Sequence, residues 1–147
     1  MSTMLVVEDL SAVGGISLSA ALPVLTAMQY EVAALPTSLL STHTSGYGTP
    51  AVVDLADWLP RVFQHWTQAE LKIDQALIGY LGSVPLCQLV TQYLAQQPLD
   101  LLVVDPVLGD LGKLYQGFDQ QYVDAMRDLI KHADVILPNT TEAALLT

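Results

Sequence analysis

The sequence predicts an α/β protein with a doubly wound, mainly parallel sheet. Short apolar runs alternate with longer segments of helical periodicity, which is the pattern of βαβ units. The run Leu101–Val104 contains no polar residue, as expected of a parallel strand buried on both faces. Hydrophobic residues make up 52% of the 147 residues and charged residues only 14%. This excess indicates strands that are buried on both faces, a surface normally covered by other polypeptide, or both.

The elements follow one another along the whole chain. Strands are expected at Met4–Val7, Glu31–Leu40, Ala76–Leu81, Leu101–Val104 and Val135–Leu137. Helices are expected at Leu18–Met28, Asp54–Trp66, Val84–Gln97, Asp119–His132 and Thr140–Leu146. Because Pro23 lies inside the first helical segment, that helix either begins near Pro23 or bends there. The length fits a single domain, residues 1–147, whose last helix is expected to be unfinished.

Charge and composition exclude several classes of partner. A net charge of −10 with only five Lys and Arg residues predicts binding neither to nucleic acid nor to an anionic membrane. The stretch Leu10–Tyr30 has no charged residue and is long enough to span a bilayer, but its glycines, serines and Pro23 favour a loop followed by a helix. The single Cys87 permits no internal disulfide, and no secretory signal is recognisable, so a cytoplasmic location is expected.

Two carboxylates follow the strand Leu101–Val104. Ligands of such sheets bind beyond the carboxyl ends of the strands, which is where Asp105 and Asp110 are placed. Two carboxylates suit a hydrated Mg²⁺ whose other ligands are water and substrate phosphates. The alternative is structural: Asp105 ends the strand and Asp110 forms an Asx-turn.

The start of the last helix also allows two interpretations. Asn139 or Thr140 can cap the helix, and Glu142 can complete the capping interaction. The same helix end favours an anion, and Glu142 could hold a cation that bridges phosphates. The sequence leaves both interpretations open.

Other motifs carry less information. A histidine in a polar loop, such as His43, is more often structural than a base. Gly14 and Gly15 lack the G-x-G-x-x-G spacing, and no P-loop motif occurs. Cys87 lies in an apolar segment without a basic neighbour, so we expect an inert core residue.

Taken in order, five segments resemble the pyridoxal kinases of the ribokinase-like fold. They are Glu8–Gly14, Leu39–Tyr47, Gly79–Gly82, Val104–Asp110 with Gly112–Tyr115, and Ala133–Glu142. The resemblance implies a three-layer α/β/α domain with a mainly parallel sheet. It also implies that residues 1–147 form the substrate-binding half and end before the family's carboxyl-terminal ATP-binding part.

The resemblance divides the site between two ligands. The residues implied for the pyridoxal pocket are Ser11, His43, Thr44 and Tyr80. The residues implied for Mg²⁺-ATP are Asp105, Asp110, Asn139 and Glu142, with Tyr115 in a flap over the phosphates. The implied metal ligands are Asp105, Asp110 and Glu142, with K⁺ as a further candidate cofactor.

The implied reaction transfers the γ-phosphoryl group of ATP to the 5′-hydroxymethyl group of pyridoxal, pyridoxine or pyridoxamine, in a homodimeric enzyme. The family's glycine-threonine-glycine-aspartate stretch, which supplies the anion hole and the base, does not occur in this chain. We therefore assign no catalytic base here and expect the 147-residue chain alone to be inactive. Two departures from the family stand out: Leu137 replaces a common hydroxyl residue, and His43 follows Thr42 where an asparagine is usual.

Three alternatives remain at this point. A kinase of the same fold could act on hydroxymethylpyrimidine or on a sugar. A non-catalytic module could bind a small molecule or dimerise. Finally, a parallel sheet with an unpaired edge and an uncovered apolar face could fail to fold by itself.

Overall fold

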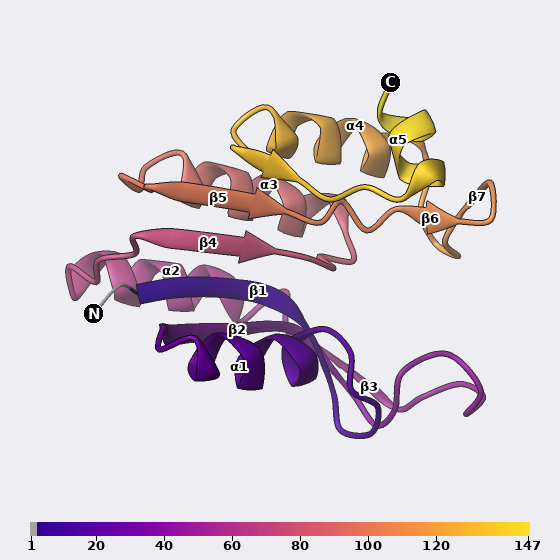
Figure 1. Cartoon of the computed structure of the whole chain (residues 1–147), viewed down its shortest axis with the longest axis horizontal. Helices are drawn as coiled ribbons and strands as arrows, with labels where there is room; N and C mark the ends of the chain where they lie inside the picture. Colours follow the sequence, from indigo (N-terminus) through magenta and orange to yellow (C-terminus); the bar gives the residue numbers. More distant parts are fainter. Residues whose placement is uncertain (1–2) are drawn as a thin grey trace.

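A computed structural model describes residues 3–147 and contains one large sheet with helices on both faces (Figure 1). The sheet has the spatial order β3 (Val52–Asp54), β2 (Glu31–Leu40), β1 (Thr3–Ser11), β4 (Gln75–Ile78), β5 (Leu101–Val104) and β8 (Val135–Ile136). Only β3 runs antiparallel to its neighbour. A separate hairpin consists of β6 (Gly109–Asp110) and β7 (Lys113–Leu114). The predicted mainly parallel α/β fold is confirmed.

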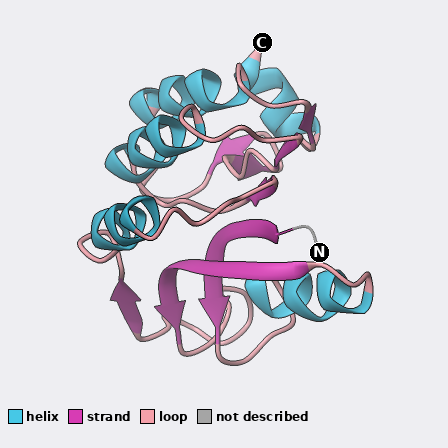
Figure 2. Cartoon of the chain, turned by 90° about the vertical axis from the view of Figure 1, so that its left-hand side faces the viewer, coloured by secondary structure: helices cyan, strands magenta, loops and turns pink. Residues whose placement is uncertain are grey.

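The helices form the outer two layers. They are α1 (Leu18–Ala27), α2 (Leu59–Gln68), α3 (Val84–Leu94), α4 (Gln120–Ile130) and α5 (Thr140–Leu146). Helix α1 lies on one face of the sheet, and α2, α3 and α4 lie on the other (Figures 1 and 2). Within residues 3–147, no helix is long and apolar enough to cross a membrane.

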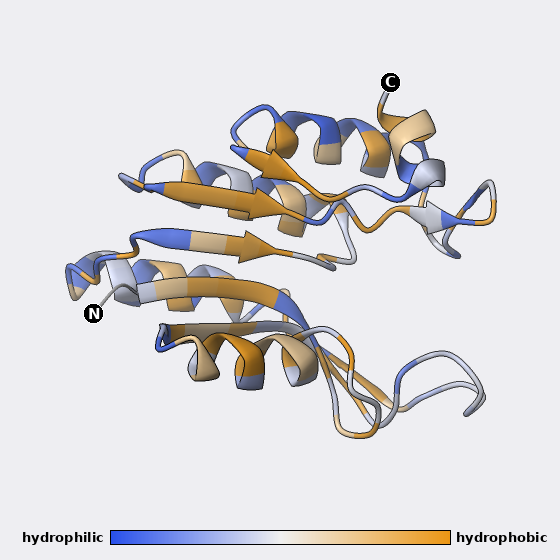
Figure 3. Cartoon of the chain, viewed as in Figure 1, coloured by the Kyte–Doolittle hydropathy of each residue, from blue (hydrophilic) through white to orange (hydrophobic). Residues whose placement is uncertain are grey.

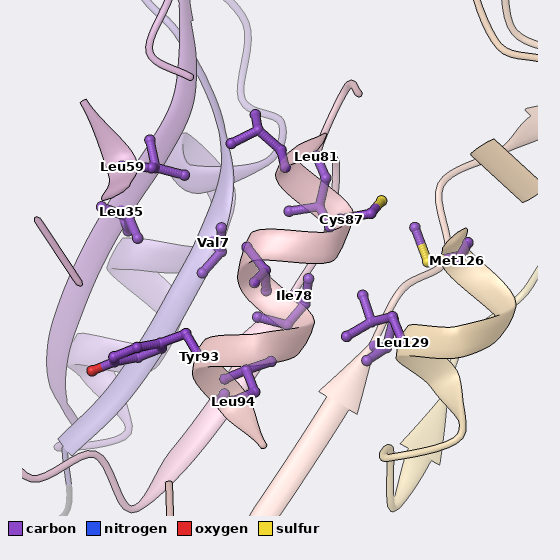
Figure 4. Close-up of a cluster of buried hydrophobic side chains, with 14 of the residues drawn as sticks. Val7, Leu35, Leu59, Ile78, Leu81, Cys87, Tyr93, Leu94, Met126 and Leu129 are labelled. Carbon is purple, nitrogen blue, oxygen red and sulfur yellow. The ribbon is translucent and has the colours of Figure 1, made fainter. Parts of the chain in front are cut away.

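Side-chain alternation along the strands produces two separate cores. Leu5 and Val7 of β1 belong to the larger core, which also contains buried residues of α2 and α3. Figure 4 shows Val7 and Ile78 in this core. Met4 and Val6 face the other way and pack with Leu18 of α1 in a smaller core. Burying each large aliphatic side chain contributes about 1.5–3 kcal/mol, so the larger core dominates the stability of the fold.

The sheet face beside α1 is only partly covered. Helix α1 packs against β1 and β2, and the apolar strands β5 and β8 lie outside its footprint (Figure 3). Val103 is half-buried there, while Val135 and Ile136 remain 43% and 40% exposed. Strand β8 therefore presents an apolar surface among the described residues, which agrees with the high hydrophobic content of the sequence.

Several predicted boundaries agree with the structure and others do not. The bounds of β2, β5 and α5 are those expected from the sequence. Helix α2 begins at Leu59 rather than Asp54, because Asp54 ends β3 and its Oδ1 accepts the Ala56 N–H at 2.7 Å. Helix α1 begins at Leu18 and includes Pro23 in its interior. Of the two predicted alternatives, a helix that begins near Pro23 is excluded, and a bend at Pro23 stays a prediction.

Candidate functional site

The candidate site lies where the strand order reverses. From β1 the chain leads by way of α1 to β2 on one side, whereas β4 lies on the other side of β1. The loops after β1 and β4 therefore diverge, and such a switch point is where open α/β sheets bind ligands. The arrowheads of β4 and β5 point toward the same end of the molecule as the β6–β7 hairpin (Figure 1). The predicted site residues occupy this carboxyl edge or the loops beside it.

Ser11 ends β1 with a hydroxyl that has no protein partner. The residue is 2% exposed, and its Oγ is buried without a hydrogen bond. Its backbone oxygen accepts a hydrogen bond from the Ser19 hydroxyl at 3.0 Å, which ties the end of β1 to α1. A buried polar atom without a partner is costly, by about 1–3 kcal/mol. The Ser11 hydroxyl therefore fits a ligand that would complete its hydrogen bonding.

The loop carrying His43 and Thr44 lies against the loop after β1. The His43 backbone N–H donates to the Val13 oxygen at 3.0 Å, and its Nδ1 accepts the Ser45 N–H at 3.2 Å. Its imidazole also meets the Tyr47 ring edge-on, with the centroids 5.0 Å apart. Through these contacts the His43 imidazole stabilises the conformation of its own loop. Thr44 is exposed on the same loop.

Tyr80 follows β4 and is supported from two directions. The Thr37 hydroxyl donates to the Tyr80 backbone oxygen at 3.0 Å, and the Phe118 ring stacks on the Tyr80 ring. Partial burial raises the Tyr80 pKa, and the carboxylates of Asp9 and Asp54 raise it further. Tyr80 therefore offers a neutral hydroxyl and an aromatic face in acidic surroundings.

Glu8 belongs to this site although the sequence did not single it out. Burial raises its pKa to about 7, with smaller contributions from Asp9 and Asp105. Its Oε2 is buried without a partner, and a side chain at Gly79 would place its Cβ 2.5 Å from Oε1. Glu8 therefore fills the crevice between β1 and β4. Its position directly before Asp9 gave no sign of this, because acidic residues at strand ends are common.

Asp105 and Asp110 occupy different surroundings. Asp105 is half-buried, and burial followed by the nearby Glu142 carboxylate raises its pKa. Asp110 is exposed in the β6–β7 hairpin, where its Oδ1 accepts the N–H of the next residue, Leu111, at 2.8 Å. An Asx-turn would bond the N–H two residues on, so this contact is not the predicted Asx-turn. The pKa of Tyr115 is raised first by burial and then by the carboxylates of Asp110, Glu142 and Asp105. The negative charges of these carboxylates therefore act on the Tyr115 hydroxyl.

Asn139 and Glu142 form a complete capping box at the start of α5. The Asn139 Oδ1 accepts the Glu142 N–H at 2.8 Å, and the Glu142 Oε2 accepts the Asn139 N–H at 2.8 Å. The Glu142 Oε1 also accepts the Leu108 N–H at 3.1 Å, and the Asn139 Nδ2 donates to the Gly109 oxygen at 2.9 Å. The capping interpretation is confirmed. These contacts also hold the loop after β5 against α5.

The three carboxylates predicted as metal ligands do not gather around one point. Among residues 3–147, no three His, Cys, Asp or Glu side chains are placed to hold a metal ion together. Since a hydrated Mg²⁺ needs only one or two protein carboxylates, the prediction that Asp105, Asp110 and Glu142 hold a metal ion stays a prediction. Both carboxylate oxygens of Glu142 accept backbone N–H groups, from Leu108 and Asn139. Asp105 takes no part in these contacts.

Two other predicted residues have clear surroundings. Cys87 is fully buried, and burial raises the pKa of its thiol to about 11, so the prediction of an inert core residue is confirmed. Leu137, which stands where the family often has a hydroxyl residue, is 54% exposed, and its backbone N–H donates to the Val104 oxygen at 3.0 Å.

Comparison with known proteins agrees with this geometry. Residues 11–147 match the family model described as phosphomethylpyrimidine kinase. This chain belongs to the phosphomethylpyrimidine kinase family. It is 82% identical to the pyridoxal kinase from Lactobacillus plantarum, with a TM-score of 0.98 over 99% of this chain and 52% of that one. The predicted resemblance to pyridoxal kinases is therefore confirmed.

Two further solved structures extend the comparison. A Bacteroides thetaiotaomicron protein described as a phosphomethylpyrimidine kinase, in a crystal form with pyridoxal, is 42% identical with a TM-score of 0.92, over 99% of this chain and 51% of that one. The Leishmania donovani pyridoxal kinase in complex with ADP and pyridoxamine is 26% identical with a TM-score of 0.90, over 98% of this chain and 53% of that one. The chain thus spans about half the length of each solved relative.

The contact between Gly14 and His43 leads to a testable prediction. A Cβ at Gly14, where φ is +106°, would overlap the His43 Cδ2, whereas a Cβ at Gly15 meets nothing within 4 Å. Gly14→Ala is therefore expected to lower the free energy of unfolding by about 1–3 kcal/mol, and Gly15→Ala by less than about 1 kcal/mol. Urea unfolding measures both. Equal stability of the two variants would contradict the placement of His43.

The pKa of Glu8 predicts how stability depends on pH. Since the pKa rises from 4.5 to about 7 on folding, its contribution to stability is complete below about pH 4.5 and is lost as the pH rises through about 7. After allowance for partial exposure, the loss amounts to about 2 kcal/mol. Glu8→Gln should remove it, giving a smaller decline in the free energy of unfolding between about pH 5 and pH 8.

The matched control for this experiment is Glu31→Gln, at an exposed glutamate that begins β2. It should keep the wild-type pH dependence. A Glu8→Gln variant whose pH profile matches that of the wild type would show that Glu8 ionises normally in the folded protein.

Proposed function

We propose that the protein containing this chain is an ATP-dependent kinase that phosphorylates the 5′-hydroxymethyl group of pyridoxal, pyridoxine or pyridoxamine. The observation that carries the proposal is the buried Ser11 hydroxyl without a protein partner, at the switch point of the sheet. A polar group of the vitamin would satisfy this hydroxyl. Tyr80 would offer its ring to the pyridine ring, with His43 and Thr44 on the adjacent loop.

Support for the vitamin comes from the relatives and from the charge of the site. The three solved relatives are pyridoxal kinases or a protein crystallised with pyridoxal. The carboxylates of Asp9 and Asp54 give Tyr80 acidic surroundings. A vitamer that carries a protonated nitrogen would be favoured by this field.

The nucleotide side is proposed to use Asp105, Asp110, Tyr115, Asn139 and Glu142. Asp105 fits a cation, because its charged form is disfavoured by burial and by the neighbouring Glu142 carboxylate. A Mg²⁺ ion bound with ATP would supply positive charge to the transferring phosphoryl group. Asp105 would bind it directly or through water, with phosphate oxygens as further ligands. Asn139 and Glu142 would act by holding the loop in place, and K⁺ remains a further proposed cofactor.

The catalytic base is proposed to lie outside residues 1–147, which form one substrate-binding unit. No candidate base and no glycine-threonine-glycine-aspartate stretch occurs in this chain. The isolated chain is therefore expected to bind ligands without turnover.

A second substrate class has specific support. The matching family model is described as phosphomethylpyrimidine kinase, and the Bacteroides relative carries the same description although its crystal contains pyridoxal. Hydroxymethylpyrimidine also presents a hydroxymethyl group on a planar ring, so it is the competing substrate in any assay of this site.

The test is phosphoryl transfer from Mg²⁺-ATP by the full-length protein, with pyridoxal, pyridoxine, pyridoxamine, hydroxymethylpyrimidine and ribose compared by kcat/KM. Preference for a B6 vitamer is expected. Preference for hydroxymethylpyrimidine or ribose would replace the proposed substrate, and no turnover with any of them, together with binding of pyridoxal, would favour a non-catalytic module.

Ser11→Ala tests the observation that carries the proposal. Loss of one hydrogen bond to the vitamer is expected to raise the Kd for pyridoxal about fivefold, measured by isothermal titration calorimetry. The control is Thr26→Ala, which removes an exposed hydroxyl from α1 and should leave the Kd unchanged. An unchanged Kd in Ser11→Ala would remove Ser11 from the vitamer pocket.

A further inference from the structure

Three aromatic rings form a stack that joins separate parts of the site. The centroids of Tyr80 and Phe118 lie 5.9 Å apart with an interplanar angle of 30°, and those of Phe118 and Tyr122 lie 3.8 Å apart at 11°. Tyr80 follows β4, Phe118 follows the β6–β7 hairpin, and Tyr122 lies in the first turn of α4. The Phe118 ring therefore lies between the vitamin-side tyrosine and a helix of the main core.

The inner end of this aromatic stack is fixed. Tyr122 is 2% exposed, and its hydroxyl accepts the Gly82 N–H at 3.1 Å. A side chain at Gly82 would in turn place its Cβ 3.1 Å from the Tyr80 Cε1. The loop that carries Tyr80 is thus tied to the same tyrosine that supports Phe118, so the two contacts fix the stack at one end.

The middle ring of the stack, Phe118, is attached to the hairpin. The Phe118 N–H donates to the Tyr115 oxygen at 3.1 Å across a four-residue turn in which Gly117 has a φ of +89°. The Tyr115 N–H donates to the Leu108 oxygen at 2.9 Å, directly before β6. Phe118 cannot move far without moving Tyr115, because the turn and the hairpin join the two residues. The carboxylates of Asp110, Glu142 and Asp105 contribute to the raised pKa of Tyr115.

We propose that Phe118 is a positioning residue that sets the Tyr80 ring against the vitamer and makes its placement depend on the β6–β7 hairpin. This inference rests on the kinase function proposed above. Phe118 itself acts through Tyr80. Positioning of this kind affects rate and affinity strongly, because phosphoryl transfer depends on the alignment of the acceptor hydroxyl with the phosphate.

The test measures steady-state kinetics of full-length protein carrying Phe118→Leu. Loss of the stacking ring is expected to raise the KM for the preferred vitamer about fivefold. Phe118→Tyr keeps the ring and should restore the KM to within about twofold of wild type. Gly117→Ala leaves all three rings present but strains the turn, and should raise the same KM about threefold.

The matched control is Phe63→Leu. Phe63 is 5% exposed and stacks on Tyr93 at 4.0 Å and 12°, so it makes a comparable ring contact in the core of α2 and α3. This variant is expected to lower the melting temperature and leave the KM for the vitamer unchanged. A purely structural role of Phe118 would give the Phe63 pattern, in which stability falls and KM does not change.

The outcomes are distinguishable. A KM within about twofold of wild type in Phe118→Leu, or an equal rise in Phe63→Leu, overturns the positioning role. An unchanged KM in Gly117→Ala overturns the dependence on the hairpin. A wild-type protein that neither binds nor phosphorylates any vitamer overturns the proposed function and this inference with it.

Discussion

The Glu142 carboxylate is the contact on which the proposed nucleotide side of the site depends. It is 4% exposed, and its two oxygens accept the N–H groups of Leu108 and Asn139. The first belongs to the loop after β5 and the second to the start of α5, so one side chain fixes the separation of two segments more than thirty residues apart. Without it, two backbone donors would lose their acceptors, at a cost of about 1–3 kcal/mol each.

The rest of the edge is arranged around carboxylates that lack cationic partners. Glu8 and Asp105 both have raised pKa values, mainly because of burial and then because of neighbouring carboxylates. In the described residues the two ion pairs, Arg127–Asp124 and Lys131–Asp128, lie in α4 and at its C-cap and involve neither Glu8 nor Asp105. Binding of a cation beside Glu8 or Asp105 would relieve the repulsion between these carboxylates.

Much of the fold could be predicted because several of its helices and strands are long enough to show a recognisable sequence pattern. The ten residues of β2 and the seven of α5 were recognisable from an apolar run and from a capping sequence. The strands β3, β6 and β7 contain only two or three residues each, which is too short for a periodic pattern. These strands are defined by pairing with other segments. The hydrogen bond from the Gly112 N–H to the Thr141 hydroxyl, at 2.9 Å, also joins segments that are distant in the sequence.

The site was predictable in outline and not in its contacts. Ser11, Tyr80 and Asp105 were placed at strand ends by the alternation of elements and by the family resemblance. The role of Glu8 depends on Gly79, which lies beside it directly after β4, and the aromatic stack joins residues up to 42 positions apart. Contacts of this kind are fixed by packing and leave no local pattern in the sequence.

The most direct test of the central contact is amide hydrogen exchange, measured by NMR at Leu108 and Asn139. Both amides are expected to exchange slowly in the wild type and at least about tenfold faster in Glu142→Ala. The Leu102 amide, which donates to the Asp134 carboxylate at 2.8 Å, is the internal reference and should be unaffected. Unchanged exchange at Leu108 and Asn139 in the variant would contradict the role of Glu142 in holding the loop after β5 against α5.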